Sequence, residues 1–272
     1  MLTKQQLLDI EKLQKECENH DHIQLKLNWE MLRNRTSKEL DFLLYENEEL
    51  IAFLGLYPFG STVEVCGMVK PSERRKNYFT LLFKQGMEVV KKKSFRKVLL
   101  NAPASSIEAK AFLTKQGAIY SFSEHQMTWE EKVLETVDGF SLRHANDNDL
   151  DMRIRLSVEA FGLPALDAEE MEVRITEDKD SDMLMIDVEN ETIGKIRIRR
   201  ENGEAWIYGF SILPTHQGKG IGRKVLQQVV LEQSNSGQSV HLEVETKNAH
   251  ALRLYESIGF KVVHAQDYYA YK

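Results

Sequence analysis

The sequence predicts a mixed α/β fold that is built twice, in two successive domains. The first observation is the segment from Trp206 to Gln233, in which an apolar run, a glycine-dense turn and a helical pattern follow one another. The second is an internal repeat, because Pro71 and Pro214 each stand between an apolar run and a helical pattern. The length of 272 residues suits two domains of ordinary size.

Composition excludes several classes of protein. With 42% hydrophobic and 29% charged residues the chain is globular in character, and a net charge of -6 argues against a general nucleic-acid-binding protein. Two cysteines are too few for a disulfide framework, and no His or Cys spacing indicates a metal site. No apolar run reaches the ~18 residues of a membrane span, and the N-terminus is too polar for a signal peptide. We therefore expect a cytoplasmic protein with no metal, membrane or nucleic-acid partner.

The second half of the chain reads as alternating strands and helices. A strand at Phe140–Arg143 leads into a helix that begins at Asp147 or Asp149 and ends at Gly162 and Pro164. The elements expected next are a short helix at 169–175, strands at 183–187, 191–199 and 204–213, a helix at 223–233, a strand at 239–245, a helix at 248–257, and two strands at 261–263 and 268–271. The first half is similar, but residues 1–18 read as helix, so the opening strand is expected to be missing.

A second anchor supports the repeat. Pro71 and Pro214 are 143 residues apart, and Gly117 and Gly259, which end similar helical segments, are 142 residues apart. We place the boundary in the polar stretch 130–139, which gives domains 1–132 and 133–272. Basic residues are concentrated between Lys70 and Lys97, either as a patch for an acidic partner or as a solvated helix face.

The glycine-dense turn has the pattern Gln217-x-x-Gly220-x-Gly222. Glycine permits positive φ, and a helix start offers free N–H groups with a partial positive charge. The segment therefore predicts a pyrophosphate site, with an ordinary helix-capping turn as the alternative. Neither the P-loop nor the Rossmann glycine spacing is present.

This loop resembles the acetyl-CoA loop of the GNAT acetyltransferases, and residues 248–260 resemble the family segment N-x-x-A-x-x-L-Y-x-x-x-G-F. The resemblance implies two tandem acyl-CoA N-acyltransferase domains, each with a mixed, mostly antiparallel sheet flanked by helices. It implies acetyl-CoA as co-substrate and transfer of an acetyl group to a primary amine of a small molecule or peptide. The residues it places at the coenzyme are Ile212 and Leu213 through their backbone, Gln217, Gly218, Lys219, Gly220, Ile221, Gly222, Arg223 and Asn248.

Two side chains are candidates for proton transfer. Tyr255 lies on the apolar face of the expected helix and is either a core tyrosine or the general acid that protonates the leaving thiolate. The run from Leu242 to Phe260 is similar to the ribosomal-protein alanine N-acetyltransferases, which implies that Glu243 is the base, directly or through water. Glu245, or a water chain without a dedicated base, remains an alternative.

The first copy departs from the pattern. Asn77 and Phe79 replace the motif glycines, and Leu113 replaces the tyrosine. We expect Phe79 to be unfavourable, because positive φ is costly for phenylalanine. The first domain is therefore interpreted as degenerate: catalytically inactive, and either structural or part of the substrate cleft.

Other functions are compatible with the same residues. A non-catalytic acyl-CoA-binding or regulatory protein would keep the loop without needing Tyr255. Another acyl donor, such as succinyl-CoA, would bind the loop equally well. The sequence leaves open the acceptor amine and the choice between a monomer and a homodimer.

Overall fold

Local capping signals set the first two helices. The computed structural model describes residues 1–272. Thr3 and Gln6 form a capping box that starts α1 (Lys4–Asp21), and Asn28 caps the short α2 (Trp29–Arg33). The chain thus opens with a helix, and the first half lacks an opening strand, as expected.

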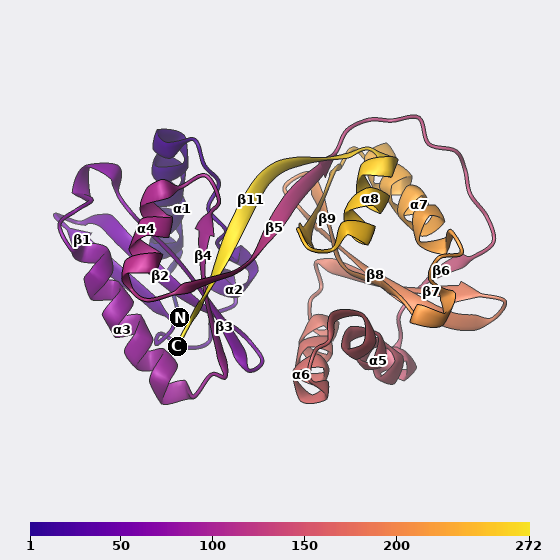
Figure 1. Ribbon diagram of the computed structural model, residues 1–272, viewed down its shortest axis with the longest axis horizontal. Helices are drawn as coiled ribbons and strands as arrows, with labels where there is room; N and C mark the ends of the chain where they lie inside the picture. Colours follow the sequence, from indigo (N-terminus) through magenta and orange to yellow (C-terminus); the bar gives the residue numbers. More distant parts are fainter. The chain divides into compact units, whose positions relative to one another are not determined.

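These helices belong to the N-terminal unit, which comprises Met1–Ser123 and His264–Lys272 (Figure 1). Its strands lie in the order β1-β2-β3-β4-β11, and only β3 and β4 are parallel. The further elements are β1 (Asp41–Glu46), β2 (Glu49–Phe59), β3 (Thr62–Val69), a 3-10 turn (Pro71–Glu73), α3 (Tyr78–Lys93), β4 (Lys97–Pro103), α4 (Ile107–Lys115) and the start of β5 (Ile119–Trp129).

The C-terminal unit is the continuous segment Glu124–Val263. Its strands lie in the order β6-β7-β8-β9-β10-β5, and only β9 and β10 are parallel. Its elements are β6 (Ser141–His144), a 3-10 turn (Asp147–Asp149), α5 (Leu150–Phe161), α6 (Ala165–Thr176), β7 (Ser181–Val188), β8 (Glu191–Glu201), β9 (Glu204–Ile212), a 3-10 turn (Pro214–His216), α7 (Ile221–Asn235), β10 (Ser239–Glu245), α8 (Ala249–Ile258) and the start of β11 (Phe260–Tyr271).

Both units have the predicted architecture of a mixed, mostly antiparallel sheet flanked by helices. In the C-terminal unit, α7 and α8 pack on one face over a core that includes Val225, Leu242 and Phe260. Helices α5 and α6 lie on the opposite face, where Leu156 packs against Met185. In the N-terminal unit, α3 and α4 cover one face of the sheet and α1 covers the other. None of the helices combines the length and apolar character needed to cross a bilayer.

Two element predictions were wrong in detail. The second helix of the C-terminal unit begins at Ala165 rather than 169, because Pro164 stands at its N-cap and favours an immediate helix start. The expected pair of strands at 261–263 and 268–271 is one continuous strand, β11. Its apolar alternation is interrupted in the middle, where the strand leaves the C-terminal unit and enters the N-terminal one.

The two units exchange their last strands. Residues Glu124–Thr128 of β5 pair with β10 of the C-terminal unit, whereas Gln266–Tyr271 of β11 pair with β4 of the N-terminal unit. Each sheet is therefore completed by a segment from the other half of the sequence. The boundary between residues 132 and 133 refers to the sequence repeat and stays a prediction, since the compact units divide the chain differently.

Candidate active site

The loop between β9 and α7 presents a bare helix start. Gly218 has φ 74° and Gly220, the N-cap of α7, has φ 80°, and no side chain caps the helix. A Cβ at either glycine would meet nothing within 4 Å, so glycine is needed here for conformation rather than for space. The open N–H groups and the helix dipole suit a pyrophosphate.

Two contacts hold this loop close to the end of β9. The Gln217 side-chain amide donates to the carbonyl of Ile212 at 2.8 Å. A Cβ at Gly222 would lie 3.4 Å from Ile212 Cδ1 and 3.6 Å from Phe210 Cζ, so the first turn of α7 approaches the strand closely. The Gln217 side chain thus fixes the loop to the end of β9.

Strands β9 and β10 separate beside the loop. Their pairing ends at Ile207 and Leu242, although β9 continues to Ile212 and β10 to Glu245. Next to this point the register of β9 against β8 shifts, and Gly209 adopts φ 56° in a β-bulge. The bulge bends β9, and the two strand ends leave a gap in the sheet hydrogen bonding.

Ile212 and Leu213, the two residues predicted to contact the coenzyme through their backbone, differ in which backbone groups are already hydrogen-bonded. The Leu213 N–H donates to Ile193 at 2.8 Å, and its carbonyl accepts from His216 at 2.8 Å. Both groups of Leu213 are therefore already engaged. Successive amides of a strand point to opposite edges, so the Ile212 N–H points toward the gap.

Tyr255 lies on the α7 and α8 side of the sheet. Its ring packs edge-on against Phe260 at 6.0 Å, and burial raises its pKa to about 12. The phenol therefore keeps its proton at neutral pH, and its hydroxyl makes no hydrogen bond within the protein. It can serve as a proton donor but not as a base.

Glu243 lies on the opposite side of the same sheet. Its strand neighbours Leu242 and Val244 are buried in the core beneath α7 and α8, so the alternation of β10 points Glu243 away from them. The side chain is half-buried, and Glu245, two residues on, is exposed. Glu243 is the first residue of β10 beyond the paired region, directly at the gap.

His241 shares this face but has no free nitrogen. Its two ring nitrogens contact the hydroxyls of Thr128 at 2.9 Å and Ser239 at 2.8 Å. Burial lowers the pKa of His241, so the ring is neutral at physiological pH. The engaged nitrogens argue against His241 as the base and leave the carboxylates of Glu243 and Glu245 as the candidates on this face.

The remaining predicted coenzyme residues surround the loop. Lys219 and Arg223 are exposed near the helix start, and Ile221 packs partly into the core. Asn248 caps α8 by accepting from the Ala251 N–H at 3.1 Å, which supports a structural role. No group of three or more His, Cys, Asp or Glu side chains is arranged to hold a metal ion.

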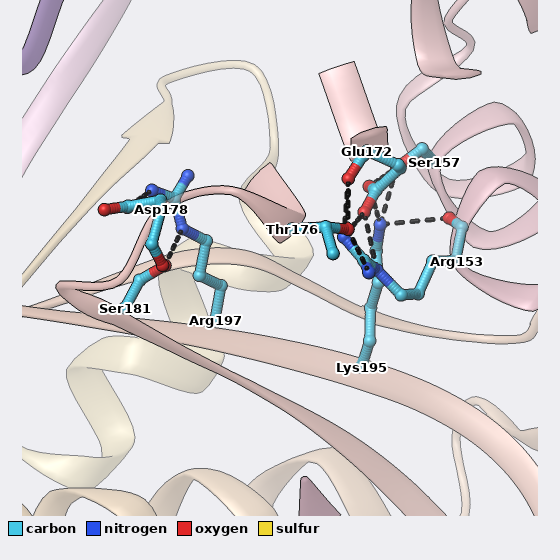
Figure 2. Close-up of polar contacts among 8 residues, drawn as sticks. All are labelled: Arg153, Ser157, Glu172, Thr176, Asp178, Ser181, Lys195 and Arg197. Carbon is cyan, nitrogen blue, oxygen red and sulfur yellow. Dashed lines mark hydrogen bonds and ion pairs between the residues drawn. The ribbon is translucent and has the colours of Figure 1, made fainter. Parts of the chain in front are cut away.

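Sequence reasoning missed a buried ionic network on the α5 and α6 side (Figure 2). Lys195 of β8 donates to the Glu172 carboxylate, to the Ser157 hydroxyl at 2.6 Å and to the Arg153 carbonyl at 3.0 Å. Arg153 also pairs with Glu172 at 3.0 Å. The charged residues that alternate along β8, namely Lys195, Arg197 and Arg199, are the signal that could have revealed a polar sheet face.

The N-terminal unit keeps the loop conformation with other residues. Arg75 has φ 66° and Asn77, the N-cap of α3, has φ 67°. The Arg74 Nε donates to the Val69 carbonyl at 3.1 Å, five residues back, as Gln217 does in the other unit. Its guanidinium also pairs with Asp21 at 2.6 Å, so α1 secures this loop.

The expectation that Phe79 adopts positive φ was wrong. Phe79 lies inside α3, and its counterpart Gly222 likewise has helical φ, so a glycine at this position serves close approach rather than a special backbone angle. The ring of Phe79 lies against Gly67, where an added Cβ would be 2.6 Å from it, and packs on Phe112 at 5.1 Å.

Comparisons with known proteins identify the family and the fold. The family model described as acetyltransferase (GNAT) domain matches residues 142–270, and the one described as acetyltransferase (GNAT) family matches residues 4–118. The crystal structure of a GCN5-related N-acetyltransferase from Sphaerobacter thermophilus superimposes with a TM-score of 0.78 at 19% identity. It covers 97% of this chain and 91% of that chain, so the two share a fold.

Curated relatives match shorter segments. Spermine/spermidine N(1)-acetyltransferase of Bacillus subtilis is 35% identical over 63 residues, 22% of this chain and 41% of that protein. Ribosomal protein bS18-alanine N-acetyltransferase of Haemophilus influenzae is 36% identical over 81 residues, 29% of this chain and 55% of that protein. The chain thus spans about half or less of the length of these relatives.

The two family models together account for both halves of the sequence, and the structure repeats one sheet-and-helix architecture in each half. This chain belongs to the GNAT acetyltransferases and carries two such domains in tandem.

Proposed function

We propose that the C-terminal unit transfers an acetyl group from acetyl-CoA to a primary amine by direct attack. The main support is that Tyr255 lies on the α7 and α8 side of the sheet, whereas Glu243 lies on the opposite side, at the gap where β9 and β10 separate. A thioester held in that gap would have a proton donor on one side and a proton acceptor on the other.

The loop residues would hold the coenzyme. The N–H groups at the start of α7 bind the pyrophosphate, and Gly218 and Gly220 give the backbone the conformation that exposes them. Lys219 and Arg223 add positive charge beside the phosphates. The Ile212 N–H pairs with the pantetheine arm, whereas Leu213 contributes through its position in the strand.

Tyr255 and Glu243 would divide the proton transfers. Glu243 accepts the proton of the attacking ammonium, directly or through water, and the amine nitrogen then forms a bond to the thioester carbonyl carbon. As the carbon–sulfur bond breaks, Tyr255 donates its proton to the leaving thiolate. No covalent bond to the protein forms.

The relatives support an amine as acceptor. The names of two of them specify spermine or spermidine and an alanine of a ribosomal protein, and acetylation at nitrogen requires an amine in each. We propose a small molecule or a peptide of this class, with acetyl-CoA as the donor that family membership implies.

We further propose that the N-terminal unit does not catalyse transfer. Asn101 is the first residue of β4 beyond its pairing with β3, the position that Glu243 has in β10. Leu113, buried in the core, stands where α8 has Tyr255. Neither proton-transfer group is present in this unit.

The test measures steady-state acetylation of a panel of amines, monitored through release of the free thiol of coenzyme A. Tyr255→Phe should lower kcat by about 10²–10⁴-fold while the dissociation constant for coenzyme A stays unchanged, because the phenyl ring keeps the packing and loses only the proton. Tyr120→Phe, which removes an exposed hydroxyl in the N-terminal unit, is the matched control.

Two outcomes would contradict the proposal. Unchanged turnover of Tyr255→Phe would remove the tyrosine from the mechanism. Tight coenzyme binding with no thiol release for any amine would favour the alternative function, a non-catalytic acyl-CoA-binding protein.

A further inference from the structure

Four planar groups form a stacked row on the Glu243 side of the C-terminal sheet. The ring of Trp206 stacks on His241 with centroids 4.9 Å apart and on Tyr208 at 6.3 Å. The Arg197 guanidinium lies over the Tyr208 ring at 5.6 Å. The row crosses three neighbouring strands, β10, β9 and β8.

The row lies directly beside the proposed base. Trp206 pairs with His241 in the register of the two parallel strands, and Glu243 follows His241 by two residues on the same face. Two residues along a strand span about 7 Å. Tyr208 is the first residue of β9 beyond the paired region, as Glu243 is in β10.

The row offers ring surface rather than hydrogen-bonding groups. The Trp206 indole N–H donates to Glu204 at 2.8 Å, and both nitrogens of His241 are engaged by hydroxyls. Trp206 and Tyr208 nevertheless remain partly exposed. A ligand gains free energy on such a surface by burying apolar or aromatic area.

The end of the row is fixed in place. Arg197 donates to Asp178 at 2.5 Å and to Ser181 at 3.1 Å, and Asp178 follows directly after α6 (Figure 2). In the same view Glu172 of α6 meets Lys195 on the same strand, so two ionic contacts secure this region to β8. A rigid surface loses less conformational entropy when a ligand binds.

We infer that the acceptor is an arylalkylamine, a primary amine carried on a short linker by an aromatic ring that binds against Trp206 and Tyr208. The backbones of Glu243 and of His241, at the end of the row, are about 7 Å apart along β10, a spacing that a linker of two or three carbon atoms can bridge. The inference rests on the proposed acetyl transfer, since it assigns the second substrate of the same site.

The experiment compares 2-phenylethylamine with propylamine, putrescine and glucosamine. We expect kcat/KM for 2-phenylethylamine to exceed that for each of the others by at least about tenfold. Trp206→Ala should raise KM for 2-phenylethylamine about tenfold, with kcat changed less than about twofold and with propylamine unaffected. Trp206→Phe should restore most of the loss, because a ring remains.

The control variant is Phe161→Ala, which removes an exposed ring of α5 in the same unit and should leave KM unchanged. Calorimetric binding of 2-phenylethylamine to the Tyr255→Phe protein with coenzyme A supplies a readout that does not depend on turnover. Binding that Trp206→Ala weakens supports the inference even if no amine is acetylated, an outcome that would overturn the proposed function alone. Equal kcat/KM for aromatic and alkyl amines, with transfer intact, would overturn the inference alone.

Discussion

The loop before α7 and the loop before α3 have nearly the same backbone conformation, although their residues differ at the positions of the family motif. Gly218 and Gly220 of one loop have φ 74° and 80°, and Arg75 and Asn77 of the other have φ 66° and 67°. Non-glycine residues tolerate this left-handed conformation at a cost of order 1–2 kcal/mol, less for asparagine. The backbone trace of the loop therefore does not distinguish a unit that binds coenzyme from one that does not.

The difference lies in the side chains around the helix start. In each unit one phenyl ring lies between the strand before the loop and the first turn of the helix after it. Phe210 reaches it from β9 and leaves Gly222 of α7 bare, whereas Phe79 reaches it from α3 and lies on Gly67 of β3. The ring is thus carried by the strand in the C-terminal unit and by the helix in the N-terminal unit.

The strand beside the loop differs as well. β9 carries a bulge at Gly209, opposite Ile196 of β8, whereas β3 pairs with β2 without any shift of register. The two units keep the same packing and loop shape although the residues of the family motif differ between them.

The largest effect is expected for Glu172→Gln. This change leaves Lys195 and Arg153 buried without a counter-charge, so the free energy of unfolding of the C-terminal unit should fall by about 3–5 kcal/mol. The counterpart of Lys195 in β2 of the N-terminal unit is Phe53, which packs on α1 without charge, and Phe53→Leu should cost only about 1 kcal/mol.

Urea unfolding measures the loss in free energy of unfolding for Glu172→Gln. A Trp29→Phe background leaves Trp129 and Trp206 as the fluorescence reporters. A loss below about 1 kcal/mol for Glu172→Gln would show that the buried charges do not depend on their carboxylate.

A smaller effect is expected when Gly222 is replaced by phenylalanine. The ring would compete with Phe210 and cover the start of α7, so affinity for coenzyme A should fall about 10–100-fold. Equilibrium dialysis of the whole protein against coenzyme A measures the change. Unchanged affinity for coenzyme A in Gly222→Phe would mean that a helix start without a covering side chain is not needed for coenzyme binding.

The smallest effect is expected for Gly220→Asn. Asn77 adopts nearly the same backbone angle at the same position, so affinity for coenzyme A should change by no more than about threefold. Gly220→Val should cost about 1–2 kcal/mol, because a β-branched residue resists positive φ. If both variants lose the same affinity for coenzyme A in the dialysis assay, that affinity depends on having no side chain at position 220 rather than on the backbone conformation there.

Much of this fold was predictable because its signals are local. The strand at 239–245 has the predicted bounds, and the predicted order of strands and helices in the second half is observed apart from the division of β11. Gly162 ends α5 with φ 64°, and the turn at Glu189 and Asn190, between the two predicted strands, has positive φ at both residues. Caps, turns and periodicity depend on neighbours in the sequence, so they can be read from it.

The rest depends on contacts between distant segments. The exchange of β5 and β11 is decided by pairing partners more than 100 residues away, which no local pattern specifies. The alternation of β10 placed His241 and Glu243 on one face, but not Trp206 beside them on β9. The Lys195 network was missed because its members come from three separate elements, α5, α6 and β8.

The exchanged strand has a consequence for how the chain is made. Tyr269 and Tyr271 belong to the core of the N-terminal unit, yet a ribosome produces them after every residue of the C-terminal unit. The unit begun first is therefore finished last, and until then the edge of β4 lacks its partner. The order in which the chain is synthesised therefore does not set the order in which its two units can finish folding, and an exposed edge of β4 is open to wrong pairing until β11 is made.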